Sequence, residues 1–352
     1  MTPLKLLVLD GDGIGPEITA ATVAVIEAAA ARFSLPLQLS RAEIGFAALA
    51  SQGTTIPPAV IAAARESAGV ILGPVSHNAY PPVAEGGLNP SGVLRRELEL
   101  YANIRPARSR QGTPRPVTAE TDLVIVRENL EGFYADRNMA SGSGEILVEP
   151  DVAIAMRKIT ARGSARIAEA AFALAAERPR ARVTTIHKAN VLRISDGLFL
   201  SEVRKVAARY PQVAHEELLV DAAAAHLVRN PSRFDVILAT NMFGDILSDL
   251  ASELAGGLGL AASLNLGVGT AVAQAQHGSA PDIAGQDRAN PSSLIGSAAM
   301  LLRHLGAGEA AQAIEAALDL ALSHPATRTP DLGGDLGTAA FGARLATMIK
   351  ET

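Results

Sequence analysis

The chain has 352 residues and a formal net charge of −5, from 31 lysines and arginines against 36 aspartates and glutamates. It contains no cysteine, which excludes disulfides, thiolate metal sites and cysteine nucleophiles. Only 3% of the residues are aromatic, and no basic excess exists, so the composition argues against nucleic-acid binding. A chain of this length exceeds one ordinary hydrophobic core and predicts two lobes.

The sequence shows no targeting signal and no membrane span. The apolar run at residues 6–9 ends at Asp10, which makes it too short for the core of a signal peptide. No apolar stretch reaches the roughly 18 residues that a membrane helix needs. We therefore expect a cytoplasmic protein without a membrane partner.

Short apolar runs alternate with longer helical patterns along the chain. In chain order we predict strand 4–9, helix 18–32, strands 70–72 and 122–127, helix 162–177, strand 182–186, helix 198–208, strand 234–240, and helices 245–254, 290–305 and 309–322. The centre of 122–127 is apolar without a break, which is typical of a strand buried on both faces. The alternation predicts an α/β fold with a largely parallel sheet.

A glycine-rich turn, DGDGIGPE at residues 10–17, follows the first strand. Its glycines let the backbone turn tightly and present N–H groups at a helix start, where an anion or a cofactor can bind. The spacing is not GxGxxG, and the lysine of a phosphate-binding loop is absent. The alternative is a plain strand-to-helix turn with Pro16 near the first helical position.

Three arginines, Arg95, Arg105 and Arg127, lie where segments end or turn. Guanidinium groups bind carboxylates with two hydrogen bonds, so converging arginines suit a di- or tricarboxylate ligand. A solvated surface position is the alternative for any single one of them. We assign Arg96 to the surface.

Two aspartates, Asp245 and Asp249, are four residues apart in a predicted helix, so their carboxylates face one side. Like charges so placed favour a hard cation such as magnesium or manganese between them. Asp221 follows an apolar run and is a candidate for a third ligand. The alternative is a helix cap at Asp245 and an exposed Asp249.

Three further residues are candidates for proton transfer or for cofactor binding. Lys188 follows a strand, where the sites of α/β proteins cluster, and can carry a proton if its neighbours lower its pKa. Tyr134 is a rare aromatic residue near Arg127. Asp282, in the loop HGSAPDIAG at residues 277–285, can bind ribose hydroxyls and would repel a 2′-phosphate. The alternatives are a solvent-facing lysine, a packed ring and a loop rich in turn formers.

The motifs, in their order, closely resemble the β-decarboxylating dehydrogenases: isocitrate, 3-isopropylmalate, homoisocitrate and tartrate or D-malate dehydrogenases. They are GDGIGPE, LYANIRP, VIVRENLEG, HKAN, FGDILSD, HGSAPDIAG and TPDLGG, and they run from residue 11 to residue 334. The resemblance implies an α/β fold of two domains around a large mixed sheet, not a Rossmann GxGxxG domain. Residues 1–100 and 256–352 would form the cofactor-binding domain. Residues 101–255 would form an inserted domain for dimerisation, metal and substrate, with an arm near residues 137–148.

The resemblance also implies a role for each matching residue. The catalytic residues that move protons would be Tyr134 and Lys188. The substrate would be held by Asn89, Ser91, Arg95, Arg105 and Arg127. The metal, magnesium or manganese, would be held by Asp221, Asp245 and Asp249. The cofactor would be held by Ile14, Asn190, His277, Gly278, Ser279, Ala280, Asp282 and Asn290. Asp282 followed by Ile283 is similar to the form of the family that prefers NAD.

The family implies a homodimer with shared active sites, in which Lys188 and Asp221 reach into the partner's site, so that a monomer would be inactive. A tetramer is the alternative assembly. The chain also departs from the family pattern. Gln274 stands where the family usually has a glutamate near the nicotinamide, and Leu130 replaces a common threonine.

The substrate's variable group would face residues 88–94, LNPSGVL. Asn89 and Ser91 match the serine and asparagine of isocitrate enzymes in swapped order, and Gly92 leaves space, so we favour an isocitrate-like substrate. The alternatives are 3-isopropylmalate, homoisocitrate, D-malate and tartrate. A non-catalytic regulatory subunit would be expected to lose a metal aspartate, the lysine or the tyrosine, and all are present. A metabolite-binding protein without turnover is a further alternative.

Overall fold

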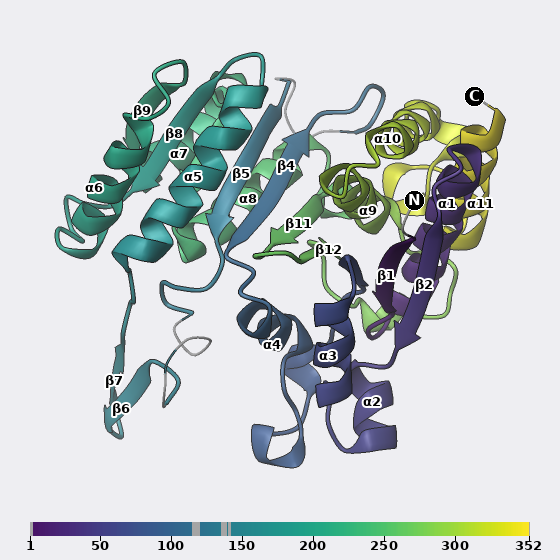
Figure 1. Cartoon of the computed structure of the whole chain (residues 1–352), viewed down its shortest axis with the longest axis horizontal. Helices are drawn as coiled ribbons and strands as arrows, with labels where there is room; N and C mark the ends of the chain where they lie inside the picture. The colour runs from purple at the N-terminus through teal and green to yellow at the C-terminus, as the bar shows by residue number, and fades with distance from the viewer. Residues whose placement is uncertain (1–2, 115–119, 135–138, 140–141, 352) are drawn as a thin grey trace. The chain divides into compact units, whose positions relative to one another are not determined.

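The computed structural model describes residues 3–114, 120–134, 139 and 142–351 (Figure 1). The chain divides into two compact units. Unit 1 comprises Met1–Leu98, Arg110–Pro114 and Gly256–Thr352, and unit 2 comprises Glu99–Ser109 and Arg115–Ala255. Both end segments of the chain therefore belong to the same unit, and the middle of the chain forms the other.

Unit 1 is built on a mixed sheet with the strand order β2-β1-β3-β12-β11. Its strands are β1 (Leu4–Leu9), β2 (Leu37–Ala42), β3 (Gly69–Leu72), β11 (Ala262–Leu266) and β12 (Ala271–Ala275). Its helices are α1 (Gly15–Arg32), α2 (Gly45–Gln52), α3 (Pro58–Glu66), α4 (Pro90–Glu97), α9 (Ser292–His304), α10 (Gly308–Ser323) and α11 (Thr338–Glu351). The pairs are parallel except β11 with β12, which only the four residues 267–270 connect. A connection this short suffices for antiparallel strands and not for parallel ones.

The strands of unit 2 follow the order β4-β5-β10-β8-β9. Its strands are β4 (Ala102–Arg108), β5 (Asp122–Glu128), β8 (Arg182–His187), β9 (Ala214–Leu219) and β10 (Val236–Ala239). Its helices are α5 (Ala161–Glu177), α6 (Ser195–Ala207), α7 (Val220–Arg229) and α8 (Asn241–Ala255). Strand β4 pairs with β5 antiparallel, whereas the pairs β5–β10, β10–β8 and β8–β9 are parallel. Two further strands, β6 (Glu145–Glu149) and β7 (Val152–Ala155), pair separately as an antiparallel hairpin.

Burial on both faces explains the unbroken apolar run of β5. Leu123 and Ile125 lie in a buried cluster with Leu247 and Ala251 of α8. Helix α5 contacts β5 and β10 as well, and Figure 1 shows α5 in front of this sheet and α8 behind it. The two helices thus cover opposite faces, as the sequence pattern predicted.

The α/β class with a large mixed sheet is confirmed, and most of the predicted elements agree with the structure to within three residues. One boundary matters for the site: α8 begins at Asn241, not at Asp245 as predicted. Asp245 therefore lies in the second turn of the helix, which excludes the alternative of a cap. Residues 137, 138, 140 and 141 of the expected arm lie outside the described residues. Within the described ranges, no helix has the length and apolar character needed to cross a bilayer.

Helices α1 and α11 pack side by side in unit 1, and a glycine permits their close approach (Figure 1). A Cβ atom added at Gly342 of α11 would lie 2.8 Å from the Cβ and 3.0 Å from the Cα of Ala21. We predict that Gly342→Ala lowers the free energy of unfolding by about 1–3 kcal/mol, because the helices must move apart. Urea denaturation measures this change.

Gly197→Ala in α6 is the matched control, because nothing lies within 4 Å of a Cβ at that position. The same substitution there should raise stability by about 0.5–1 kcal/mol through helix propensity alone. A Gly342→Ala variant as stable as the wild type would show that the close contact carries no constraint.

Candidate active site

Unit 2 brings two buried arginines to one carboxylate. Arg105 on β4 and Arg127 on β5 are 7% and 2% exposed. The Nη1 atom of Arg105 lies 3.1 Å from Oδ1 of Asp245, and Nη1 of Arg127 donates to the same oxygen. Asp249, one turn further along α8, has its Oδ1 3.4 Å from Nη1 of Arg105. Arg105, one of the predicted substrate arginines, therefore contacts both aspartates of the predicted metal pair.

Two guanidinium groups and two carboxylates lie close together at this point. Burial, together with the nearby charge of Arg127, lowers the pKa of Arg105 to about 10. Burial raises the pKa of Asp249, against the attraction of Arg105 and with the added repulsion of Asp245. Partly desolvated carboxylates of this kind gain from a cation, and their oxygens are the donors that magnesium and manganese prefer. The donor set of Asp245 and Asp249 therefore fits a divalent metal.

Neutral side chains fix the two guanidinium groups in place. Asn103 accepts from Nε of Arg105 at 2.6 Å, and Ser248 accepts from its Nη1 at 2.7 Å. Asn241 accepts from Nε and Nη2 of Arg127 at 3.0 and 2.7 Å. Sequence reasoning missed all three supporting residues. Their signal was spacing: Asn103 is two residues from Arg105 on a strand, and Asn241 and Ser248 lie about one turn from Asp245.

Helix α8 approaches Arg127 closely because residue 244 is glycine. A Cβ atom at Gly244 would lie 2.7 Å from Cγ and 2.8 Å from Cβ of Arg127. A side chain at this position would push the helix, and Asp245 with it, away from the arginine. Gly244 in the FGDILSD motif thus allows Asp245, the next residue, to pair with Arg127.

Tyr134 belongs to the same cluster. Its hydroxyl donates to Oδ2 of Asp245 at 2.8 Å, and the guanidinium of Arg127 lies 5.4 Å from the centre of its ring. Both oxygens of Asp245 are therefore used, one by the arginines and one by the tyrosine. The structure brings together five residues that the sequence predicted for the site: Arg105, Arg127, Tyr134, Asp245 and Asp249.

Lys188 and Asp221 form a separate pair in the same unit. Lys188 follows β8, Asp221 lies in the first turn of α7, and Nζ donates to Oδ1 at 2.6 Å. This hydrogen bond lowers the pKa of Asp221. The backbone N–H of Lys188 donates to the buried Asp196 at 2.6 Å, which fixes the turn. Among the described residues, no three His, Asp or Glu side chains gather to hold a metal, so Asp221 stays apart from the α8 pair within one chain.

In unit 1 the glycine-rich turn packs on the loop at residues 277–285. The N–H of Ile14 donates to the carbonyl of Ser279 at 2.9 Å. A Cβ atom at Gly13 would lie 2.0 Å from the same carbonyl oxygen, so only glycine fits there. The hydroxyls of Ser279 and Ser76 are 2.7 Å apart. Two of the predicted cofactor residues, Ile14 and Ser279, are thereby brought into contact.

Glu17 holds the far end of this loop. Its carboxylate oxygens accept the N–H groups of Gly285 at 2.5 Å and Asp287 at 2.9 Å. Sequence reasoning used Glu17 only as part of a motif, and no feature of the sequence connects it with residues 285 and 287. Gly278 and Ala280 belong to the held loop, where Ala280 has a φ of 36°.

His277 presents an unused acceptor. Its Nδ1 pairs with the carbonyl of Gly278 at 3.0 Å, and burial lowers the pKa of the ring, which favours the neutral form. Its Nε2 is buried, and within the described part of the chain it has no hydrogen-bond partner. A buried acceptor of this kind fits the amino group of an adenine base. The loop thus offers one acceptor that suits the adenine base of a nicotinamide cofactor.

The remaining predicted cofactor residues differ in their surroundings. Asn290 donates to Asp331 at 2.9 Å and accepts from the N–H of Ser292 at 3.0 Å. Asp282 is exposed in a short 3₁₀ turn, Pro281–Ile283. Asn190 belongs to unit 2 and is exposed, so it does not share a unit with the others.

Helix α4 of unit 1 carries the residues predicted to face the substrate. Asn89 caps the helix by accepting from the N–H of Gly92 at 3.2 Å, so its side-chain oxygen has a structural partner. Ser91 is 7% exposed and donates to Gln274 at 3.2 Å. Arg95 is buried, whereas the exposed Arg96 pairs with Glu97 at 3.2 Å, as expected for a surface residue.

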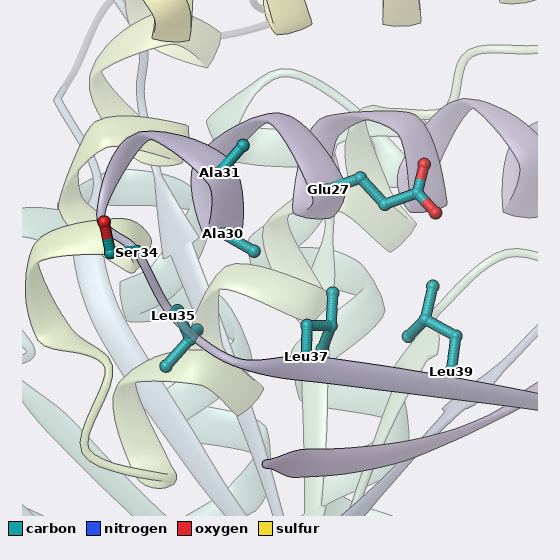
Figure 2. Close-up of a pocket in the computed structure, with 7 residues that line it drawn as sticks. All are labelled: Glu27, Ala30, Ala31, Ser34, Leu35, Leu37 and Leu39. Atoms are coloured by element: carbon teal, nitrogen blue, oxygen red, sulfur yellow. The ribbon is translucent and has the colours of Figure 1, made fainter. Parts of the chain in front are cut away.

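A cavity of about 400 Å³ lies apart from these residues, between the end of α1 and β2 (Figure 2). It is lined by Glu27, Ala30, Ala31, Ser34, Leu35, Leu37 and Leu39, none of which belongs to the predicted site.

Comparison with known proteins agrees with this arrangement. Residues 5–345 match the isocitrate/isopropylmalate dehydrogenase family. The chain is 44% identical over 348 residues to the isocitrate/homoisocitrate dehydrogenase of Thermus thermophilus, covering 98% of each chain. It is 40% identical to the 3-isopropylmalate dehydrogenase of Archaeoglobus fulgidus, covering 98% of this chain and 99% of that one. The crystal structure of isocitrate dehydrogenase from Methylococcus capsulatus superposes with a TM-score of 0.89 at 39% identity, covering 98% and 99%. The chain belongs to the isocitrate/isopropylmalate dehydrogenase family.

The buried carboxyl group of Glu128, beside the site, has an unusually high pKa. Glu128 follows Arg127 and is 4% exposed, and its oxygens accept the N–H groups of Leu130 at 2.9 Å and Glu131 at 2.7 Å. Burial nevertheless raises the pKa of Glu128 from 4.5 to about 7. The folded chain therefore keeps this proton to a higher pH than the unfolded chain does.

We predict a pH dependence of stability from this group. Because its pKa is raised on folding, its contribution is fully present below pH 4.5 and is lost as the pH rises through about 7. Glu128→Gln removes the titration and keeps an acceptor oxygen, so its Tm relative to the wild type should increase between about pH 5 and pH 8. Calorimetry at several pH values tests this, with Glu66→Gln at the exposed end of α3 as the control. A Tm difference that does not change with pH would contradict the assignment.

Proposed function

We propose that the protein catalyses the NAD-dependent oxidative decarboxylation of a 3-substituted malate to a 2-keto acid and carbon dioxide, with magnesium or manganese and with an isocitrate-like substrate. The observation that carries the proposal is the cluster in which Arg105, Arg127 and Tyr134 converge on Asp245, next to Asp249. It combines groups for an anionic substrate, a metal and a proton in one place. Family membership and the relative named isocitrate/homoisocitrate dehydrogenase support it.

The arginines serve the carboxylates of the substrate. Neutral partners hold Arg105 and Arg127 in place. The two positive charges lie near the carboxylate of Asp245 and near the half-exposed carboxylate of Asp249. A substrate carboxylate would supply further compensating charge. Arg95 on α4 is the third arginine of the proposed set.

Asp245 and Asp249 would hold the metal, with Asp221 supplied by the partner subunit. A divalent ion held there would supply Lewis acidity toward the substrate hydroxyl and toward the charge left by decarboxylation, and a bound nicotinamide would supply the hydride acceptor. The residues of the chain orient the substrate and move the protons around these events.

Lys188 would take the proton of the hydroxyl. In the structure its ammonium group donates a hydrogen bond to Asp221 at 2.6 Å, which holds the end of the side chain in place. Tyr134 would then protonate the carbon, because Asp245 orients its hydroxyl and the charge of Arg127 stabilises the phenolate that remains.

The loop at residues 277–285 would bind the cofactor, with His277 accepting a hydrogen bond from the base. The exposed carboxylate of Asp282 would bind ribose hydroxyls and repel a 2′-phosphate, which favours NAD over NADP. The relative named isocitrate dehydrogenase [NAD] subunit alpha from Macaca fascicularis, 39% identical, is consistent with this preference.

The protein would work as a homodimer. The hairpin of β6 and β7 exposes apolar side chains, with Leu147 at 69%, Val148 at 52% and Ile154 at 50%. Apolar strands so exposed are typical of surfaces that another chain covers. A second copy would cover them and bring Lys188 and Asp221 into the neighbouring site, and a tetramer remains the alternative assembly.

A substrate panel tests the proposed activity. With NAD and magnesium, we predict that the wild type reduces NAD fastest, by kcat/KM, with isocitrate or homoisocitrate, ahead of 3-isopropylmalate, D-malate and tartrate. Lys188→Met should lower kcat by at least about 100-fold, because general-base catalysis contributes on that order, and should leave NAD affinity within about twofold.

Lys205→Met is the matched control, because this lysine is exposed and pairs with Glu202 on its own helix. It should keep wild-type activity. Absence of turnover by the wild type on every substrate would favour the non-catalytic subunit, and an active Lys188→Met variant would refute the role of the lysine.

A further inference from the structure

Arg157 holds a buried carboxylate beside the turn that carries Lys188. It lies just after strand β7, and its side chain is 7% exposed. Its Nη1 atom donates to Oδ1 of Asp196 at 2.6 Å and to Oγ of Ser195 at 2.8 Å. Asp196 lies in the first turn of α6, and its exposed fraction is 0%. Arg157 and Asp196 therefore form an ion pair that is shielded from solvent.

The second oxygen of Asp196 fixes the main chain at Lys188. Oδ2 accepts the backbone N–H of Lys188 at 2.6 Å. The carbonyl of Lys188 accepts the N–H groups of Val191 at 2.9 Å and Leu192 at 2.8 Å, and the carbonyl of Leu192 accepts the N–H of Asp196 at 3.0 Å. These bonds close the turn between β8 and α6. One carboxylate thus joins the guanidinium of Arg157 to the main chain from which the lysine side chain extends.

The same guanidinium contacts the segment that leads into α8. Its Nη2 atom donates to Oγ1 of Thr240 at 3.0 Å, and it lies 5.6 Å from the centre of the Phe243 ring. Thr240 directly follows β10 and directly precedes α8, the helix that carries Asp245. Because a guanidinium is planar and its donors have fixed directions, contacts on α6 and at the start of α8 define its position. The carboxylate of Asp196 is thereby held at one point.

We propose that Arg157 is a positioning residue for Lys188 and acts on it through Asp196. The proposal rests on the proposed function, in which Lys188 takes the proton of the substrate hydroxyl. A buried carboxylate that loses its positive partner is strongly unfavourable, so Asp196 would move or admit water if Arg157 were removed. The N–H of Lys188 would then lose its acceptor, and the amino group would no longer be held at one distance from the substrate. A misplacement of about 1 Å at a reacting group can cost about 100-fold in rate.

Arg157→Met tests the proposal, because it removes the charge and keeps a long side chain. We expect kcat to fall by about tenfold to 100-fold, and the KM values for substrate and NAD to stay within about threefold of the wild type, because the proposed substrate arginines and the cofactor loop keep their own supports. Arg157→Lys keeps a positive charge beside Asp196 and should recover kcat to within about threefold of the wild type.

Arg178→Met is the matched control. Arg178 pairs with another buried aspartate of unit 2, Asp235, whose Oδ1 lies 2.5 Å from its Nε. The substitution removes an arginine from a buried carboxylate in the same way, but should leave kcat unchanged. An equal fall of kcat in Arg157→Met and Arg178→Met would overturn the proposal, because loss of any buried ion pair would then have the same effect.

A double variant separates positioning of the lysine from a general effect on the fold. If Arg157 acts through Lys188, Arg157→Met in the Lys188→Met background should lower the remaining kcat by less than about twofold. A loss of about tenfold or more in both backgrounds would overturn the proposal, and so would a wild-type kcat in Arg157→Met. Should Arg157→Met fail to fold, Arg157→Gln, whose amide can still donate to Asp196, carries the same comparison.

Amide hydrogen exchange provides a readout that does not depend on turnover. The N–H of Lys188 should exchange faster in Arg157→Met than in the wild type, and at the wild-type rate in Arg178→Met. Unchanged exchange at Lys188 in Arg157→Met would overturn the proposal. Failure of the proposed function has a different signature: the wild type would then turn over no 3-substituted malate. The catalytic role of Arg157 would fall with it, and faster exchange would support only its contact with the turn.

Discussion

The carboxylate of Asp245 is the group on which the site depends. It accepts hydrogen bonds from Arg105, Arg127 and Tyr134, and so connects β4, β5 and the segment after β5 to helix α8. Two buried guanidinium groups side by side are costly unless anionic and neutral acceptors surround them. Asp245 provides the anion, and Asn103, Asn241 and Ser248 provide the neutral acceptors. These hydrogen bonds hold both guanidinium groups in defined positions, which favours precise positioning of a substrate.

The loop at residues 277–285 is also held in a defined position, but by other kinds of contact than the Asp245 cluster. No ion pair is recorded between the glycine-rich turn and this loop in the described part of unit 1; backbone groups and Glu17 hold it instead. Gly13 allows the contact with Ser279, and the carboxylate of Glu17 satisfies two N–H groups of the loop. Backbone atoms in fixed positions suit a cofactor whose contacts are with sugar hydroxyls and a base.

The sequence predicted the fold class because apolar runs and helical patterns alternate, and it predicted the composition of the Asp245 cluster through motif resemblance. It could not predict the antiparallel pairs, because the strand pattern does not contain strand direction. It placed the start of α8 four residues too late. Glu17 and Ser248 were missed because their partners become neighbours only in the folded chain. Asn103 was missed although its partner, Arg105, is only two residues away.

The sequence also could not predict which side chain donates and which accepts in each hydrogen bond. Asn89 and Ser91 match a known polar pair, yet Asn89 caps its own helix and Ser91 gives its proton to Gln274. A residue type indicates that a donor exists, and only the neighbours show whether it is free. This is why the substrate was harder to predict than the reaction class.

We propose that one chain supplies two separate parts of a site, Asp245 with its arginines and Lys188 with Asp221, and that two subunits complete it. The most direct test is the activity of a purified heterodimer of Lys188→Met and Asp245→Asn subunits carrying different tags. Each homodimer should be inactive, whereas the heterodimer contains one intact site and should recover about half of the wild-type activity. A heterodimer as inactive as both parents would show that each site is built within a single chain and would contradict the account.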